Sequence, residues 1–257
     1  MKRKKVLSID LSVGEYRTFV DNIIDLSLKK RSSYVCVANV HMVIESHGNS
    51  DYADIVNGAE IITPDGMPLA KMLRYLYKIK QERVAGMDIF PDLLSEAEKQ
   101  KIPTYFFGSS EKVLKKIEQK ALYEFPKLII AGLFSPPFRK LSESEENEIV
   151  KKINYSNASL IFVALGCPKQ EIWMKRMKGK INGVMVGVGG AFPVYAGITK
   201  RAPLWMQKTS LEWLFRMIQE PGRLWKRYLV TNSKFIFLSL IELIRIRVLK
   251  KTGFSVK

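Results

Sequence analysis

Short apolar runs alternate with amphipathic stretches along most of this 257-residue chain. The apolar runs are four or five residues long and rich in β-branched and aromatic residues. They are Tyr34–Ala38, Glu60–Thr63, Thr104–Phe107, Leu128–Ala131, Leu160–Ala164 and Val184–Val188. Their apolar character is largely continuous rather than alternating, which predicts strands buried on both faces.

The stretches between these runs carry apolar residues at three- and four-residue spacing, which predicts amphipathic helices. They are Leu69–Lys80, Phe90–Lys101, Glu111–Glu124, Ser144–Asn154 and Gln170–Lys178. Strands that alternate with helices form a largely parallel sheet with right-handed crossovers. The pattern therefore predicts an α/β, Rossmann-like fold with helices on both faces of the sheet.

The alternation stops near residue 198, and the tail has the pattern of helices at Thr209–Gln219 and Gly222–Leu249, the second with or without breaks. We therefore divide the chain into a core, residues 1–198, and a C-terminal appendage, residues 199–257. The longest apolar run, Phe235–Ile241, is too short for a membrane span. The basic segment Lys2–Lys5 lacks the long apolar run of a signal peptide, so a cytoplasmic location is expected.

Charge adds a constraint on the partner. Hydrophobic residues make up 47% of the chain, as in a globular protein, but the net charge is +17. The appendage holds 13 Lys and Arg against three acids, so it carries +10 of this excess. An anionic partner is expected, and composition leaves nucleic acid, an anionic membrane surface and phosphorylated substrates open.

Glycine and small polar residues follow every predicted strand. These segments are Asn39–His41, Pro64–Gly66, Gly108–Ser110, Gly132–Phe138, Gly166–Gln170 and Gly189–Phe192. Ligands of parallel sheets bind beyond the carboxyl ends of the strands, where glycine permits close approach and helix N-termini favour anions. The sequence therefore predicts a nucleotide- or phosphate-binding face.

No metal or cofactor is expected. The two histidines and the two cysteines, Cys36 and Cys167, lack zinc-ligand spacing, and the cysteines are predicted to be buried free thiols. No Asp-x-Asp pair follows a strand, and Asp51 and Asp54 have the spacing of a solvated helix face. A dinucleotide fingerprint at residues 187–192 is disfavoured, because its sixth position is Phe192 and it comes late in the chain.

Two polar residues are ambiguous on local grounds. Asp65 precedes a predicted helix with a proline in its first turn, so an N-cap is locally favoured over a catalytic carboxylate. Arg83 follows a basic helix, which favours a solvated side chain over a clamp on a diphosphate.

Arginine and tryptophan are interleaved in the appendage, at residues 200–205, 212–216 and 220–228. Such side chains can stack on nucleobases, grip a pyrophosphate at a membrane surface, or simply pack helices together. Composition does not choose among these three.

Taken together, these blocks resemble the WecG/TagA/CpsF family of bacterial glycosyltransferases. The matching segments are Asn39, Pro64–Met67, Arg83–Asp88, Leu165–Glu171, Gly187–Phe192, Arg201–Pro203, Glu212–Trp213 and Arg227–Tyr228. Many members have Thr where this chain has Val37, and Asp where it has Pro193. These two departures leave the donor sugar in doubt more than the reaction type.

The resemblance implies an inverting, metal-independent transfer from a UDP-sugar to a polyprenyl-diphosphate-linked sugar. The donor sugar would be N-acetylmannosamine, its uronate, glucose or a similar sugar, for teichoic acid, capsule or exopolysaccharide synthesis. It also implies a catalytic core and an appendage that docks on the inner face of the cell membrane. A twin subunit packed against the last helix is an open alternative.

Site residues follow from the same resemblance. Asp65 falls on the family's proposed general base, and Arg83 on an arginine near the donor diphosphate. With no metal expected, the leaving UDP needs arginines and backbone N–H groups. The other residues predicted to bind substrate are Asn39, Gly108, Ser109, Gly166, Lys169, Gln170 and Gly190. Arg201, Arg216, Arg223 and Arg227 are predicted to face the acceptor pyrophosphate and the anionic leaflet.

Two other classes compete with this interpretation. A nucleic-acid-binding protein would use the basic, tryptophan-containing appendage, but that class does not explain the glycine-rich turns of the core. A non-catalytic member of the family is disfavoured, because Asp65 and Arg83 are present together.

Overall fold

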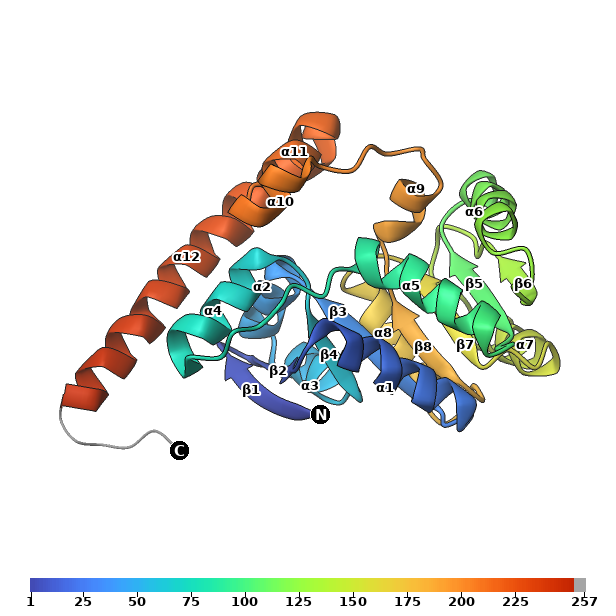
Figure 1. The fold of residues 1–257 in the computed structure, drawn as a ribbon, viewed down its shortest axis with the longest axis horizontal. Helices are drawn as coiled ribbons and strands as arrows, with labels where there is room; N and C mark the ends of the chain where they lie inside the picture. Colours follow the sequence, from blue (N-terminus) through green and yellow to red (C-terminus); the bar gives the residue numbers. More distant parts are fainter. Residues whose placement is uncertain (252–257) are drawn as a thin grey trace.

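Six parallel strands form the central sheet of the computed structural model, which describes residues 1–251 (Figure 1). The strand order is β4-β3-β8-β7-β5-β6. The strands are β3 (Ser33–Ala38), β4 (Ile61–Pro64), β5 (Thr104–Gly108), β6 (Ile130–Phe134), β7 (Leu160–Ala164) and β8 (Val184–Gly187). The predicted α/β class is confirmed.

Helices cover both faces of this sheet, and successive strand residues point into two separate cores. In β7, Leu160 and Phe162 face one core while Ile161 and Val163 face the other. The first core is covered by α1 (Tyr16–Leu28), α5 (Gly86–Lys99), α6 (Glu111–Glu124) and α9 (Ala191–Tyr195). The second is covered by α2 (Val40–Gly48), α3 (Ser50–Asn57), α4 (Met67–Tyr77), α7 (Glu143–Tyr155) and α8 (Lys169–Met177).

The predicted strands agree with the structure to within one or two residues, except at β6. The prediction placed a fully buried strand at residues 128–131, but β6 begins at Ile130 and its residues are only half-buried. Leu128 is buried in the turn that precedes the strand. β6 lies at one edge of the sheet and is left half-buried there, unlike the other edge strand, β4, which packs against residues 9–13 and is fully buried.

The N-terminal region contains elements that the pattern did not predict. A hairpin of β1 (Lys2–Val6) and β2 (Ile9–Val13) precedes α1, and the basic segment lies in β1. Arg3 attaches this hairpin to the core, because its guanidinium donates to the carbonyl oxygens of Asn57 at 2.8 Å and Glu60 at 2.9 Å. These long-range contacts leave no periodic signal in the sequence.

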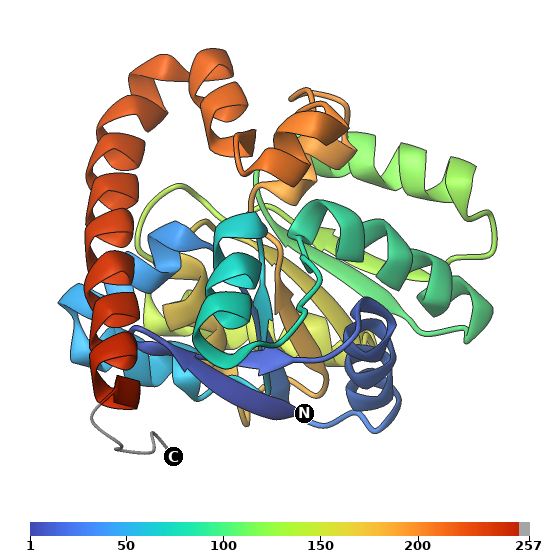
Figure 2. The same ribbon diagram turned by 60° about the vertical axis from the view of Figure 1, so that its left-hand side comes forward.

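The appendage is helical, with α10 (Leu204–Thr209), α11 (Glu212–Gln219) and α12 (Pro221–Lys251). The last of these is one continuous helix that lies along α2 and α4 (Figures 1 and 2). Phe235 of α12 is buried in the second core, so the appendage packs on the body of the protein. Within the described chain, no helix combines the length and apolarity that a membrane crossing requires.

Candidate active site

Two cavities meet where the sheet ends and the appendage begins. The first, here called the loop cavity, has a volume of about 380 Å³ and lies over the carboxyl ends of the strands. Its floor is formed by turns that follow β3, β5, β7 and β8, and appendage arginines form one wall. This is the face at which parallel sheets bind ligands.

The second cavity, here called the α4–α12 groove, has a volume of about 390 Å³. It begins at the ends of β3 and β4 and runs between α4 and α12. Most of its lining is apolar, with Met72, Phe235 and Ile236 among its residues.

Asp65 lines both cavities, together with Asn39, Glu212, Arg216 and Arg227. Its backbone N–H donates to the carbonyl oxygen of Ala38 at 2.8 Å, which fixes the turn after β4 beside the end of β3. The local N-cap expectation is wrong. Gly66 is the N-cap of α4, at a φ of 99° that favours glycine, so the Asp65 carboxylate is left for the cavities.

Burial, and after it the negative charge of Glu212, raise the pKa of Asp65 to about 7. The positive charges of Arg83 and Arg216 oppose this shift. A carboxylate that titrates near neutral pH can accept a proton from a substrate hydroxyl more readily than one with an ordinary pKa. Asp65 thus has the environment expected of a general base.

Three appendage arginines reach the loop cavity: Arg216, Arg223 and Arg227. Arg216 passes directly over Gly190, where an added methyl group would lie 2.7 Å from its Nη2 atom. Arg223 donates to Glu220 at 2.6 Å, whereas Arg216 and Arg227 have no carboxylate partner among the residues whose side chains are described. Their charges are therefore available to an anionic ligand.

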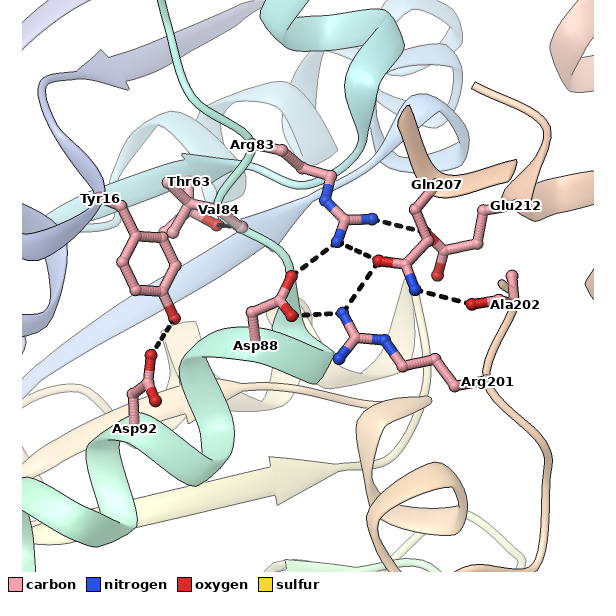
Figure 3. Close-up of polar contacts among 10 residues, drawn as sticks. All are labelled: Tyr16, Thr63, Arg83, Val84, Asp88, Asp92, Arg201, Ala202, Gln207 and Glu212. Carbon is pink, nitrogen blue, oxygen red and sulfur yellow. Dashed lines mark hydrogen bonds and ion pairs between the residues drawn. The ribbon is translucent and has the colours of Figure 1, made fainter. Parts of the chain in front are cut away.

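Arg83 lies elsewhere, in a polar network that joins the core to the appendage (Figure 3). Its guanidinium donates to Asp88, Gln207 and Glu212, each at 2.7 Å. The side chain is only 13% exposed, so the local expectation of a solvated arginine is wrong. Arg83 lines neither cavity, and its role at the donor diphosphate stays a prediction.

Arg201 belongs to the same network and also lines neither cavity. It contacts Asp88 in an ion pair and donates to Gln207 at 3.2 Å, as Figure 3 shows. Gln207 in turn donates to the carbonyl oxygen of Ala202 at 2.7 Å. The structure thus places Arg201 apart from the other three predicted appendage arginines.

The predicted substrate-binding glycines and polar residues divide in the same way. Asn39, Ser109, Gly166, Gln170 and Gly190 line the loop cavity. Gly108 and Lys169 line neither cavity.

Two of these residues are occupied by structural tasks. Gly108 has a φ of 105°, and an added methyl group would lie 2.5 Å from the carbonyl oxygen of Ala164. The N–H of Ser109 donates to that same oxygen at 2.9 Å, so it is not free for a phosphate. Lys169 is exposed at the start of α8.

Gln170 is held by a buried polar cluster below the loop cavity. Its Nε2 donates to Glu171 at 2.9 Å, and Tyr52 donates to the other carboxyl oxygen of Glu171 at 2.8 Å. The Oε1 atom of Gln170 has no hydrogen-bond partner among the residues that the structure describes. Cys36 is buried as predicted, while Cys167 is half-buried and has its Sγ 3.2 Å from the Tyr52 hydroxyl.

Glu212 and His41 are site residues to which the sequence analysis gave no role. Glu212 and Trp213 form one of the segments that resemble the family, but the residues around Glu212 in the sequence do not indicate that it lies near Asp65 in the fold. His41 stands two residues after Asn39 and lines the α4–α12 groove. Among the described residues, no group of three or more His, Cys, Asp or Glu side chains could hold a metal ion.

Comparison with known proteins gives a consistent result. The model of the glycosyl transferase WecG/TagA/CpsF family matches residues 4–248. An N-acetylglucosaminyldiphosphoundecaprenol N-acetyl-beta-D-mannosaminyltransferase of Bacillus spizizenii strain W23 is 31% identical over 231 residues, covering 89% of this chain and 88% of the relative. The Bacillus subtilis strain 168 enzyme of the same name is 33% identical over 202 residues, covering 78% of this chain and 77% of its own.

Proposed function

The chain belongs to the WecG/TagA/CpsF family of glycosyl transferases, and from this premise we propose that it moves a sugar from a UDP-sugar to a polyprenyl-diphosphate-linked sugar. The relatives' names give a diphosphoundecaprenol-linked N-acetylglucosamine as their acceptor and N-acetylmannosamine as the sugar they transfer. N-acetylmannosamine is accordingly the first donor sugar to test. Val37 and Pro193 line the loop cavity, so they are the residues at which a different donor would be accommodated.

The observation that carries the proposal is the position of Asp65 between the two cavities. The UDP-sugar occupies the loop cavity, and the acceptor sugar enters from the α4–α12 groove. The acceptor hydroxyl then meets the anomeric carbon at Asp65, which takes the proton as the new bond forms. General-base catalysis of this kind contributes about 10²- to 10⁴-fold in rate. Attack from the side opposite to UDP inverts the anomeric configuration.

The leaving UDP gains negative charge as the glycosidic bond breaks. Arg216 and Arg227 line the loop cavity and have no carboxylate partner among the described side chains, and Arg223 lies beside them. Preorganised cations in a site that excludes water stabilise such charge strongly. We assign the diphosphate of UDP to Arg216 and Arg223, and this assignment makes the proposed reaction independent of a metal.

The Asp65→Asn variant tests the base assignment. With UDP-N-acetylmannosamine and a short lipid-diphosphate N-acetylglucosamine acceptor, kcat is expected to fall at least about 100-fold. Equilibrium binding of UDP should stay within a few-fold of wild type, because the substitution preserves shape. Near-normal turnover of this variant would reject Asp65 as the base.

Metal independence is tested separately with the wild-type enzyme. Loss of its transfer activity in EDTA would reject a metal-independent reaction.

A further inference from the structure

The α4–α12 groove changes character along its length. At the sheet end its lining includes Asp65, Arg216 and Arg227. Farther along α12 it is lined by Phe235, Ile236 and Leu243, which face apolar side chains of α4. Arg227 and Leu243 are 16 residues apart on one helix, a rise of about 24 Å. The groove therefore suits an elongated ligand with a polar head and an apolar tail.

The polar end has buried side-chain nitrogens that lack hydrogen-bond partners within the described part of the chain. Among the residues whose side chains are described, Arg227 forms no ion pair, and its buried Nε has no acceptor. The Nδ2 of Asn232, which lines the groove beside Arg227, is also buried without a hydrogen-bond partner in the described part of the chain, whereas the Nδ1 of His41 lies 3.7 Å from the Glu45 carboxylate. Lys71 lies at the rim, with its Nζ donating to the Ser210 hydroxyl at 3.1 Å. Asp65 and Glu212 are the carboxylates that line this end of the groove, and they would repel an anionic group placed next to them. The position for an anionic group is therefore farther along the groove, at Arg227.

The apolar end opens onto an exposed apolar surface. Ile236 lines the groove and is 59% exposed. Its neighbours on the outer side of α12, among them Phe237 and Leu240, are exposed but do not line the groove. Exposed apolar side chains of α12 thus lie beyond the groove, where the part of a chain too long for the groove can continue.

We propose that the α4–α12 groove binds the first isoprene units of the acceptor's polyprenyl chain, with the lipid-proximal phosphate at Arg227. This inference rests on the proposed function, because it extends the acceptor from its sugar to its lipid. The order along the groove is sugar at Asp65, diphosphate at Arg227 and prenyl chain against Phe235 and Ile236. In this arrangement the diphosphate-linked sugar of the acceptor lies outside the bilayer, next to Asp65.

A bilayer phospholipid is a poorer occupant than a prenyl chain. It carries two acyl chains, whereas the groove has a volume of about 390 Å³ and a single cationic end. One branched chain attached to a diphosphate matches both features. Since each buried methylene strengthens binding about fourfold, a few isoprene carbons dominate the affinity of a soluble acceptor.

An equilibrium binding experiment tests whether the α4–α12 groove binds a prenyl chain, and it does not depend on catalysis. Trp213 lines the groove, so its fluorescence can report titration with farnesyl diphosphate below its micelle concentration. Farnesyl diphosphate is expected to bind at least tenfold more tightly than inorganic diphosphate. Ile236→Asp should weaken binding about tenfold, and the matched Phe237→Asp should stay within twofold. Equal effects of the two variants, or displacement by dihexanoyl phosphatidylglycerol at similar concentration, would overturn the proposal.

A transfer experiment separates this proposal from the proposed function. Acceptors with N-acetylglucosamine diphosphate on a methyl, geranyl or farnesyl group are compared in detergent-free solution. For wild type, kcat/KM should rise at least tenfold from methyl to farnesyl; Ile236→Asp should remove most of that rise, whereas the matched Phe237→Asp should keep it. A kcat/KM that does not change with the length of the acceptor's prenyl chain would overturn the groove assignment. Farnesyl diphosphate binding with no transfer to any acceptor overturns the proposed function and leaves the groove assignment standing.

Discussion

At the residue scale, the electrostatic setting of Asp65 depends on an acid that arrives from the appendage. Glu212 is the charged neighbour that raises the pKa of Asp65 most, while Arg83 binds Glu212 and opposes the shift. The sequence placed Asp65 at a strand end, but its local context favoured a helix cap. Only the conformation of Gly66 shows that the carboxylate is free of that task.

The first prediction concerns pH. Asp65 acts as a base only when ionised, so kcat/KM should fall as the pH drops below about 7, the value to which its pKa is raised. Glu212→Gln removes a negative charge, lowers the pKa of Asp65 and should move this acid limb to lower pH. Glu148→Gln, an exposed carboxylate on α7, is the control and should leave the limb in place. An unmoved limb in Glu212→Gln would contradict the argument.

The second prediction concerns the contact between Gly190 and Arg216. A methyl group at Gly190 would lie 2.7 Å from Nη2 of Arg216, and the backbone φ of −67° tolerates alanine. Gly190→Ala should therefore fold normally while displacing the guanidinium from the loop cavity. We expect the KM for the UDP-sugar to rise about tenfold, as for loss of one charge-assisted hydrogen bond.

Gly48→Ala serves as the control for that variant, because an added methyl group there meets nothing within 4 Å. Steady-state kinetics with varied UDP-sugar give the comparison. If Gly190→Ala raised only the KM for the acceptor, Arg216 would belong to the acceptor and not to the donor diphosphate.

At the scale of elements, the position of α11 is set by the network around Arg83 rather than by an apolar interface alone. Arg83 comes from the segment before α5, Asp88 from α5 itself, and Gln207 and Glu212 from α10 and α11 (Figure 3). The segment is itself fixed to the sheet, since the N–H of Val84 donates to the carbonyl oxygen of Pro64 at 3.0 Å. The turn that carries Asp65 and the helix that carries Glu212 are thus held together.

The third prediction follows from this network. Arg83→Met leaves Glu212 without its cation, and we expect a loss of about 2–3 kcal/mol in the free energy of unfolding. The thermal midpoint should fall by about 5–10 °C. Arg139→Met removes an exposed pair with Glu145 and should shift the midpoint far less.

The thermal midpoint and the UDP affinity of the same variant distinguish two roles for Arg83, as a ligand of the donor diphosphate or as a residue that holds the appendage on the core. If Arg83 binds the diphosphate, the variant should keep its thermal midpoint and bind UDP more weakly. A docking residue predicts the reverse, a lowered midpoint with UDP binding close to wild type when measured well below the transition. Arg83→Lys should give intermediate values, because one ammonium group cannot reproduce the forked geometry.

At the scale of the whole molecule, the appendage combines positive charge with an exposed apolar helix face. Leu229, Phe237 and Leu240 are exposed on α12, and Lys226 lies near Trp225 at the start of this face. Apolar burial combined with basic residues is the usual basis of peripheral binding to anionic bilayers. We extend the proposed function accordingly, with the appendage resting on the membrane that holds the acceptor.

The fourth prediction tests this orientation with vesicles. The protein should co-sediment with phosphatidylglycerol vesicles more strongly than with phosphatidylcholine vesicles, and salt should weaken the binding. Replacing Phe237 and Leu240 by Glu should reduce binding at least tenfold. Tyr155→Glu, on α7, is the control, because Tyr155 is 91% exposed but lies outside the appendage. Equal binding of the control and the double variant would contradict the proposed orientation.

The sequence by itself determined the α/β class, the family, the strand-end turns around the site, and the order along the chain of the six strands of the central sheet. These are local properties, because periodicity and turn chemistry depend on neighbours along the chain. Arg83, Arg201 and Glu212 show where this information ends. Arg83 and Arg201 were assigned to phosphates, yet both belong to a network between core and appendage, while Glu212 was given no role and lines both cavities. Only the tertiary structure decided these positions, because the partners of a charged side chain are set by contacts more than 100 residues apart, for which a single sequence carries no periodic signal.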